Sequence, residues 1–278
     1  MDKNGILSSQ VIQANSLKFN LCSLGSGPPV LLLHGFPDSS KLWRHIMEPL
    51  AANGYRVIAY DQRGFGDSDA PPDESDYALD LIVSDAVAII RQLGISEPIY
   101  IVGHDWGAFV GWLFCLQHPA LVKKFVAVSV GHPLAFKHAG LQQKLKSWYV
   151  FFFQLRGIAE RELSKNDWAA FRRMAKGYPE LTSWIADLSR PGRLTAALNW
   201  YRANFRLFLT SKFGKCKVAT LGVHSPQDLA LTVKQMTDSA KYMDAAWKYV
   251  SIDQSSHWIP LDQPDILLSD ISDWFRNQ

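Results

Sequence analysis

Short apolar runs alternate along this chain with stretches of helical periodicity, and that alternation limits the possible folds more than any other feature. Each run is rich in aliphatic or β-branched residues and is bounded by Gly, Pro or Asp. The runs are Pro29–Leu33, Tyr55–Tyr60, Pro98–Val102 and Phe125–Ser129. Runs of this kind are typical of strands that are buried on both faces of a parallel sheet.

The segments between these runs carry apolar residues at the spacing of a helix; they are Ser40–Asn53, Ala78–Leu93 and Trp106–His118. A repeated strand–helix–strand order predicts an α/β fold with a doubly wound, mostly parallel sheet. The order is interrupted after Ser129. It resumes with two strands and a C-terminal helix, at Val218–Gly222, Trp247–Ile252 and Pro264–Phe275.

The interruption differs from the rest of the chain in its composition. Residues 134–215 are rich in aromatic side chains at helical spacing, and they carry 15 Lys and Arg against 5 Asp and Glu. The rest of the chain keeps 14 of the 29 basic and 21 of the 26 acidic residues. We therefore expect a core of residues 1–133 and 216–278 and a helical cap of residues 134–215, held on the core partly by opposite charge.

Composition excludes several classes of protein. A net charge of +3 without any Lys/Arg-rich run argues against nucleic acid as a partner. Three cysteines (Cys22, Cys115 and Cys216) are too few for a disulfide framework, so we expect free thiols. No apolar segment follows Met1–Gly5, and no apolar run reaches the roughly 18 residues of a membrane span. The chain is therefore expected to be cytoplasmic, without a membrane span.

The segment Gly103-His-Asp-Trp-Gly107 has the pattern of a nucleophile elbow. It directly follows an expected strand and opens an expected helix. A turn this tight needs glycine-sized neighbours, and it projects the central side chain above the sheet. That side chain is Asp105, at a helix N-terminus whose free N–H groups favour an anion. A helix-capping aspartate after a glycine turn is the simpler alternative.

A general base and an acid that orients it should follow the nucleophile in the chain. His257, in the loop Ser255–Pro260, is the one histidine in that order. Asp228 follows the strand expected to end at Gly222 and is the candidate acid, whereas Asp253 is less well placed. We expect His34 and His104 to be structural.

Backbone N–H groups near the nucleophile can stabilise an oxyanion. The turn His34-Gly-Phe-Pro37 closes an earlier expected strand, and Trp106 directly follows the nucleophile. The N–H groups of Phe36 and Trp106 are therefore the candidate oxyanion hole.

Together these motifs resemble the α/β-hydrolase superfamily, and specifically its epoxide hydrolase branch, whose nucleophile is an aspartate. The resemblance covers nearly the whole chain and is carried by His34–Pro37, Asp61–Ser68, Gly103–Gly107 and Ser256–Trp258. It implies the α/β-hydrolase fold with a helical cap. In the second of these segments, we expect Asp61 and Arg63 to fix a turn.

Haloalkane dehalogenases share part of these motifs, so the cap segments decide between the epoxide hydrolase and the haloalkane dehalogenase families. Two cap segments, Trp148–Glu160 and Ala197–Arg202, look like segments of epoxide hydrolases. In that family, the first segment carries an acid tyrosine five residues before its Gln, and the second segment carries another acid tyrosine. The resemblance assigns these positions to Tyr149 and Tyr201. The family usually has proline where this chain has Arg156.

The resemblance implies that Asp105 attacks an epoxide while Tyr149 and Tyr201 protonate its oxygen, because the alkoxide leaving group is strongly basic. His257, oriented by Asp228, then activates a water that hydrolyses the ester to a vicinal diol. The implied partner is a small apolar epoxide, a homodimer is possible, and no cofactor or metal is predicted. The alternatives are a haloalkane dehalogenase-like hydrolase and a ligand-binding sensor on a hydrolase scaffold.

Overall fold

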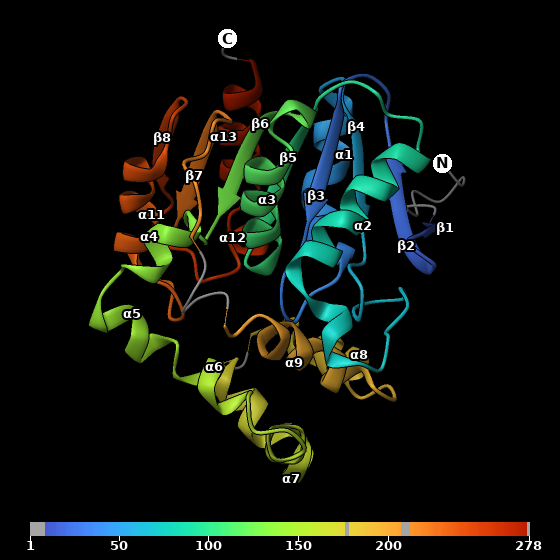
Figure 1. The fold of residues 1–278 in the computed structure, drawn as a ribbon, viewed down its shortest axis with the longest axis vertical. Helices are drawn as coiled ribbons and strands as arrows, with labels where there is room; N and C mark the ends of the chain where they lie inside the picture. Colours follow the sequence, from blue (N-terminus) through green and yellow to red (C-terminus); the bar gives the residue numbers. More distant parts are fainter. Residues whose placement is uncertain (1–8, 176–177, 207–211, 277–278) are drawn as a thin grey trace.

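An eight-stranded sheet forms the centre of the computed structural model, which describes residues 9–175, 178–206 and 212–276 (Figure 1). The strand order is β1-β2-β4-β3-β5-β6-β7-β8. β2 pairs antiparallel with β1 and with β4, and all other neighbours are parallel. The strands are β1 (Ser9–Ala14), β2 (Leu17–Leu24), β3 (Pro29–Leu33), β4 (Arg56–Tyr60), β5 (Ile99–His104), β6 (Val122–Val128), β7 (Thr220–His224) and β8 (Trp247–Ser251).

Helices cover both faces of this sheet, as the sequence pattern predicts. α2 (Leu79–Gln92) and α3 (Trp106–Gln117) pack on one face, and α1 (Arg44–Ala52), α12 (Ile259–Asp262) and α13 (Pro264–Arg276) on the other. α3 is the most deeply buried of these, because every residue from Trp106 to Cys115 is buried. The remaining short elements are α11 (Val233–Thr237) and four 3₁₀ turns: Ser40–Trp43, Glu74–Tyr77, Pro119–Leu121 and Asp238–Tyr242.

A run of helices between β6 and β7 lies at the carboxyl ends of the parallel strands (Figure 1). It consists of α4 (Pro133–Lys137), α5 (Leu141–Lys146), α6 (Trp148–Phe152), α7 (Ile158–Met174), α8 (Leu181–Leu188) and α9 (Arg193–Ala203). We call this run the helical segment. No helix within the described ranges is long and apolar enough to cross a membrane.

Hydrogen bonds fasten α9 to the loops above it. The indole N–H of Trp200 donates to the carbonyl oxygen of Arg63 at 3.1 Å, and the side chain of Asn204 bonds the backbone at Tyr77 and Leu79. These bonds are buried, so each would be costly to leave unpaired. They fix the position of α9 and therefore that of Tyr201, one of the two expected tyrosines.

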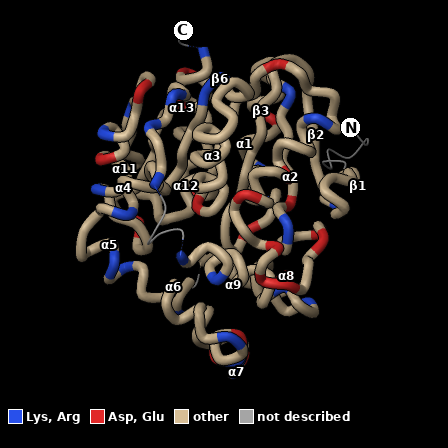
Figure 2. The backbone as a smooth tube through the Cα atoms, in the orientation of Figure 1, with Lys and Arg blue, Asp and Glu red and all other residues tan. Residues whose placement is uncertain are grey.

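Ion pairs join basic residues of the helical segment to acidic residues in loops of the core, as expected for a basic segment on an acidic core (Figure 2). Arg190 lies 2.9 Å from Asp67, and Arg156 lies 2.8 Å from Glu74. Arg156, which stands where the family usually has proline, thus serves as one of these links. Such exposed pairs contribute only about 0–1 kcal/mol each, so buried contacts hold the segment in place.

Three differences separate the expected elements from the observed ones. β1 and β2 were not expected, because neither has a continuous apolar run; β1 is a mostly exposed edge strand, and β2 buries only Phe19 and Leu21. The predicted helix Ser40–Asn53 begins with a 3₁₀ turn, and α1 starts at Arg44. β7 runs from Thr220 to His224 rather than from Val218 to Gly222, which brings its end closer to Asp228.

Candidate active site

The turn between β5 and α3 places Asp105 in a strained conformation above the sheet. Its backbone φ and ψ angles are 53° and −122°, a region that residues other than glycine rarely adopt. A Cβ atom at Gly103 would collide with the backbone of Gly107, and one at Gly107 would collide with the carbonyl group of Leu33. Only glycine therefore permits this turn, as expected of a nucleophile elbow.

The two carboxylate oxygens of Asp105 have different surroundings. Oδ1 accepts a hydrogen bond from the backbone N–H of Phe36 at 2.8 Å, while Oδ2 lies 3.6 Å from Nε2 of His257. Burial acts to raise the pKa of Asp105, but its bonds to His257 and to the N–H of Trp106 outweigh it and lower the pKa. Asp105 is therefore an anion, with one oxygen already held by a backbone donor.

His257 and Asp228 form a close buried pair. Nδ1 of His257 lies 2.7 Å from Oδ2 of Asp228. The other oxygen of Asp228 accepts the N–H groups of Ala230 and Leu231 at 2.8 and 2.9 Å. These bonds hold the carboxylate in one orientation. Asp253 is exposed and accepts only the hydroxyl of Ser251, so it lies outside this arrangement.

The charge of His257 depends on the two carboxylates that flank it. Burial acts to lower the pKa of His257, but the charges of Asp228 and Asp105 outweigh it and raise the pKa to about 10. The resting site thus contains an imidazolium between two carboxylates. Loss of the charge on Asp105 would remove part of this effect and make the ring easier to deprotonate.

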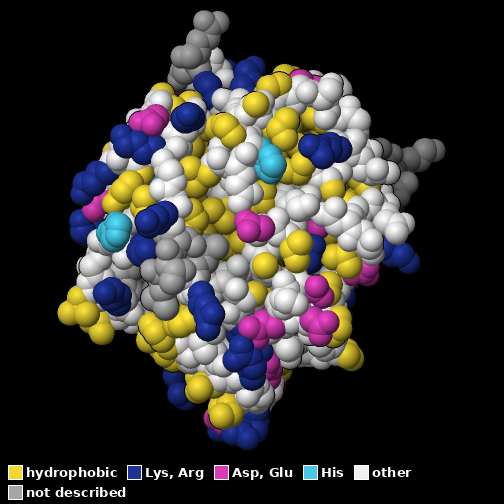
Figure 3. All heavy atoms as spheres, viewed as in Figure 1, with side chains coloured by type: hydrophobic (Ala, Val, Ile, Leu, Met, Phe, Trp, Pro, Cys, Tyr) yellow, Lys and Arg dark blue, Asp and Glu magenta, His cyan; other side chains and the backbone are white. Residues whose placement is uncertain are grey.

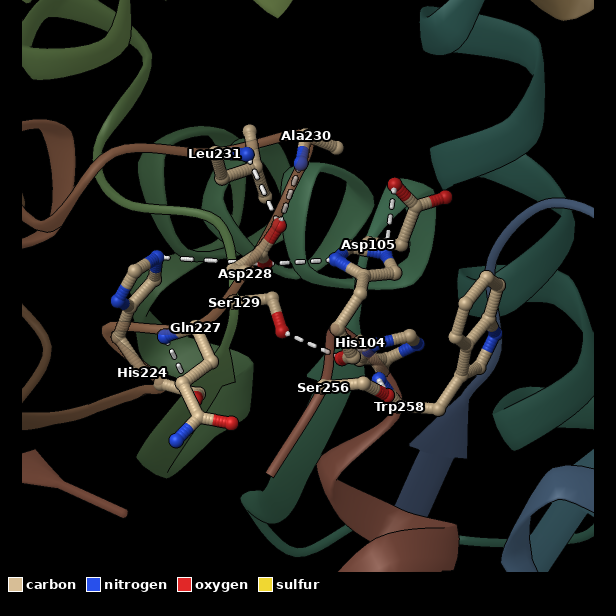
Figure 4. Close-up of polar contacts among 12 residues, drawn as sticks. His104, Asp105, Ser129, His224, Gln227, Asp228, Ala230, Leu231, Ser256 and Trp258 are labelled. Atoms are coloured by element: carbon tan, nitrogen blue, oxygen red, sulfur yellow. Dashed lines mark hydrogen bonds and ion pairs between the residues drawn. The ribbon is translucent and has the colours of Figure 1, made fainter. Parts of the chain in front are cut away.

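His34 and His104 make the structural contacts expected of them. Nε2 of His34 accepts the backbone N–H of Gln62 at 2.9 Å. His104 and the hydroxyl of Ser129 both bond the carbonyl oxygen of His257, at 2.9 and 3.1 Å (Figure 4). His104 therefore steadies the backbone of the loop that carries His257.

Sequence reasoning missed His224, which ends β7 and faces the candidate acid (Figure 4). Its Nε2 lies 4.0 Å from Oδ2 of Asp228, the oxygen that His257 also contacts. Burial lowers the pKa of His224 to about 4, so the ring is neutral. A histidine at the end of the strand, four residues before the acid, was the available signal.

Asp38 is a second residue that sequence reasoning missed. Its carboxylate is buried and accepts the indole N–H of Trp184, in α8, at 2.8 Å and that of Trp258 at 3.1 Å. Burial raises the pKa of Asp38 to about 7. Because Trp258 follows His257, this carboxylate joins the helical segment to the loop of the candidate base.

The two expected tyrosines come together over Asp105. Tyr149, in α6, and Tyr201, in α9, have ring centroids 6.0 Å apart. Tyr201 also packs against Phe36 and Trp106, with ring centroids 5.6 and 5.0 Å away. Burial and the nearby charge of Asp105 raise the pKa of both phenols, so both remain protonated.

A cavity of about 450 Å³ lies beside this cluster. Asp105, Trp106, Tyr149 and Tyr201 line it, together with mainly apolar side chains such as Phe109. The carboxylate of Asp105 and two protonated phenols therefore line one space of the size that accommodates a small organic molecule.

Comparison with known proteins places this architecture in a family. Residues 28–264 match the family model described as the alpha/beta hydrolase fold. A Bacillus subtilis relative, "AB hydrolase superfamily protein YfhM", is 32% identical, and the match covers 97% of this chain and 98% of that protein. The chain therefore belongs to the α/β-hydrolase superfamily, which confirms the predicted fold.

Other relatives define the branch within that superfamily. "Epoxide hydrolase 2" of Siraitia grosvenorii is 32% identical over 95% of this chain and 97% of its own length. The crystal structure of epoxide hydrolase A from Mycobacterium thermoresistibile is 25% identical, with a TM-score of 0.84 and coverage of 97% and 98%. Epoxide hydrolase VrEH1 from Vigna radiata has the same identity and TM-score, with 99% of each chain covered. The chain belongs to the epoxide hydrolase family, as its motifs predict.

Proposed function

We propose that this protein is an epoxide hydrolase that converts an epoxide and water to a vicinal diol through a covalent ester on Asp105. The shared cavity of Asp105, Tyr149 and Tyr201 is the observation that carries the proposal. Opening an epoxide requires a nucleophile at carbon and a proton donor at oxygen. A halide leaves without a proton, so two buried phenols would have no chemical task in a dehalogenase.

The first step is ring opening. Oδ2 of Asp105 is the attacking atom, because Oδ1 is held by the N–H of Phe36. A bond forms from Oδ2 to an epoxide carbon while the bond from that carbon to the epoxide oxygen breaks. The phenols of Tyr149 and Tyr201 hydrogen-bond that oxygen, and one of them transfers its proton to it. The product is an ester of Asp105 with a neighbouring free hydroxyl group. The phenolate left behind regains a proton from the imidazolium of His257, which leaves that ring neutral and able to act as a base.

The second step is hydrolysis of that ester. His257, oriented by Asp228, removes a proton from a water that attacks the ester carbonyl carbon. The carbonyl oxygen is Oδ1, so the negative charge develops where the N–H of Phe36 already donates; the N–H of Trp106 is the second donor. Collapse of the intermediate breaks the bond between the carbonyl carbon and the diol oxygen, which takes up the proton of the new carboxyl group. The diol leaves, the Asp105 carboxylate carries one oxygen from the water, and His257 is again an imidazolium.

Residues 134–215 act as a cap in this proposal. They supply both tyrosines and much of the cavity wall, while the core supplies Asp105, His257 and Asp228. The three cysteines are free thiols, which supports a cytoplasmic location. The homodimer remains a prediction.

Product analysis tests this proposal. Aliphatic, terpene and styrene-type epoxides, each matched with a haloalkane of similar size, should give diol from the epoxide and little halide from its partner. The Asp105→Ala variant should be inactive on both. Halide release alone would identify a dehalogenase. Binding without turnover would identify a sensor.

A further inference from the structure

One edge of the helical segment gathers exposed apolar side chains. Six of the eleven large exposed apolar residues in the described part of the chain fall between Leu141 and Ile158, with exposures of 43–72%. They are Leu141, Leu145, Trp148, Phe151, Leu155 and Ile158, and we call them the apolar edge. They follow one another at intervals of three or four residues along α5, α6, the turn after α6 and the start of α7. Scattered exposed apolar residues are ordinary, but a group like this one marks an interaction surface.

The sequence around the apolar edge is basic, although Arg156 pairs with Glu74, and Lys146 donates to the carbonyl oxygens of Asp228 and Leu231. Residues 134–159 contain four Lys and Arg and no Asp or Glu. Figure 3 shows apolar and basic side chains together along the lower left margin, over α5 and α6. Apolar and aromatic residues with cations beside them are typical of helices that lie in the interface of an anionic bilayer. If this surface met itself in a second copy, its cations would face each other.

The apolar edge also lies at the rim of the cavity. Lys144 and Phe151 line that cavity, and Phe151 is 59% exposed, so the cavity extends to this edge. Leu141, Leu145 and Trp148 do not line it. α5 and α6 lie on the outer side of the helical segment, below the sheet in the view, and α7 extends farthest from the sheet (Figure 1). A flat surface in contact with the apolar edge would therefore meet the cavity and leave the sheet free.

We propose that the apolar edge docks reversibly on anionic lipid bilayers. The docked protein takes apolar epoxides from the lipid phase, and this choice of substrate source rests on the proposed function. Leu145 and Trp148 enter the interface between headgroups and acyl chains, while Lys144 and its basic neighbours approach the anionic headgroups.

Vesicle co-sedimentation tests docking in the absence of any substrate. The wild-type protein should bind vesicles of phosphatidylcholine with one quarter phosphatidylglycerol, and bind less as salt rises. The Leu145→Ser/Trp148→Ser variant should bind at least tenfold more weakly, because two apolar side chains are lost from the interface. The matched control, Val11→Ser/Ile266→Ser, removes equally exposed apolar residues elsewhere and should bind like wild type.

Activity on a water-soluble epoxide separates docking from catalysis. Both double variants should retain wild-type turnover of that substrate, because none of the four residues lines the cavity. Docking that persists in the Leu145→Ser/Trp148→Ser variant would overturn the proposal. So would light scattering that shows a dimer which this variant dissociates, since the edge would then be an interface between copies. Failure of every form to turn over any epoxide, with docking intact, would reject only the proposed function.

Discussion

At the scale of single residues, the proposed mechanism depends on one imidazole between two carboxylates. His257 contacts Asp228 through Nδ1 and faces Asp105 through Nε2. Ester formation neutralises Asp105, which removes one of the charges that raise the pKa of His257. The nucleophile's own reaction therefore prepares the base for the next step.

The first prediction concerns the base. The His257→Gln variant should form the ester on Asp105 but fail to hydrolyse it, because no group remains to deprotonate the water. Intact-protein mass spectrometry after addition of an epoxide should show a stable adduct with the mass of the substrate. The Asp253→Asn variant is the matched control and should turn over normally. Normal turnover in the His257→Gln variant would reject this assignment.

The second prediction concerns the two phenols. Each donates to an oxygen whose charge grows as the ring opens, so each stabilises the transition state more than the bound substrate. A single Tyr149→Phe or Tyr201→Phe change should slow ester formation roughly ten- to a hundredfold, about 1.4–2.7 kcal/mol. The double variant should lose nearly all epoxide opening, as measured by rapid-mixing kinetics. An equal loss on an alkyl halide would show that the phenols serve packing instead.

At the scale of elements, contacts between distant segments join the parts of the site. Asp38 follows β3, Trp184 lies in α8 and Trp258 follows the candidate base. Stacking adds to these bonds, since Tyr178 lies parallel to Trp184 with ring centroids 5.4 Å apart. The helical segment and the loop of His257 therefore share one anchor.

The third prediction tests that anchor. The Asp38→Ala variant leaves the buried indole N–H of Trp184 and the partly buried one of Trp258 without an acceptor, and a buried donor without a partner costs about 1–3 kcal/mol. Its free energy of unfolding in urea should fall by at least about 2 kcal/mol. The Asp38→Asn variant keeps one acceptor oxygen and avoids the cost of a buried charge, so it should lose less. Equal losses in the two variants would contradict this role.

Local patterns predicted much of this architecture, whereas long-range contacts could not be predicted. Asp105 is visible in sequence because its turn needs two nearby glycines, and His257 because it comes late in the chain. The contact of Asp38 with Trp184 spans 146 residues, so no local pattern reveals it. β1 was missed for a different reason, because its residues are mostly exposed and carry no buried stripe. His224 was missed because its contact with Asp228 depends on where β7 ends.

At the scale of the whole molecule, buried neutral histidines set the response to acid. His104, His132 and His224 are buried, and burial lowers the pKa of each to about 4. Below pH 6.5 the unfolded chain protonates these rings while the folded protein does not, so stability falls as pH falls from about 6.5 to 4. Asp38, whose pKa is raised to about 7, opposes part of this loss.

The fourth prediction follows from that balance. The melting temperature should decrease steadily between pH 6.5 and pH 4.5 in calorimetry. His132 lies away from the triad and stacks on Tyr242 with ring centroids 5.2 Å apart. The His132→Gln variant should therefore show a shallower slope than wild type, even if it is less stable at pH 7. The matched control is exposed His45, and His45→Gln should leave the slope unchanged.

Under the proposed mechanism, the positions of Asp105 and the two phenols also have a stereochemical consequence. Oδ2 of Asp105 must approach the attacked epoxide carbon from the side opposite the carbon–oxygen bond that breaks, because the two phenols hold the epoxide oxygen on the other side. The attacked carbon therefore inverts its configuration, and a ring-fused epoxide yields only the diol with its two hydroxyl groups on opposite faces. The configuration of the diol therefore shows which of the two epoxide carbons was attacked. Whatever part of the cavity wall favours one carbon also determines the handedness of the diol.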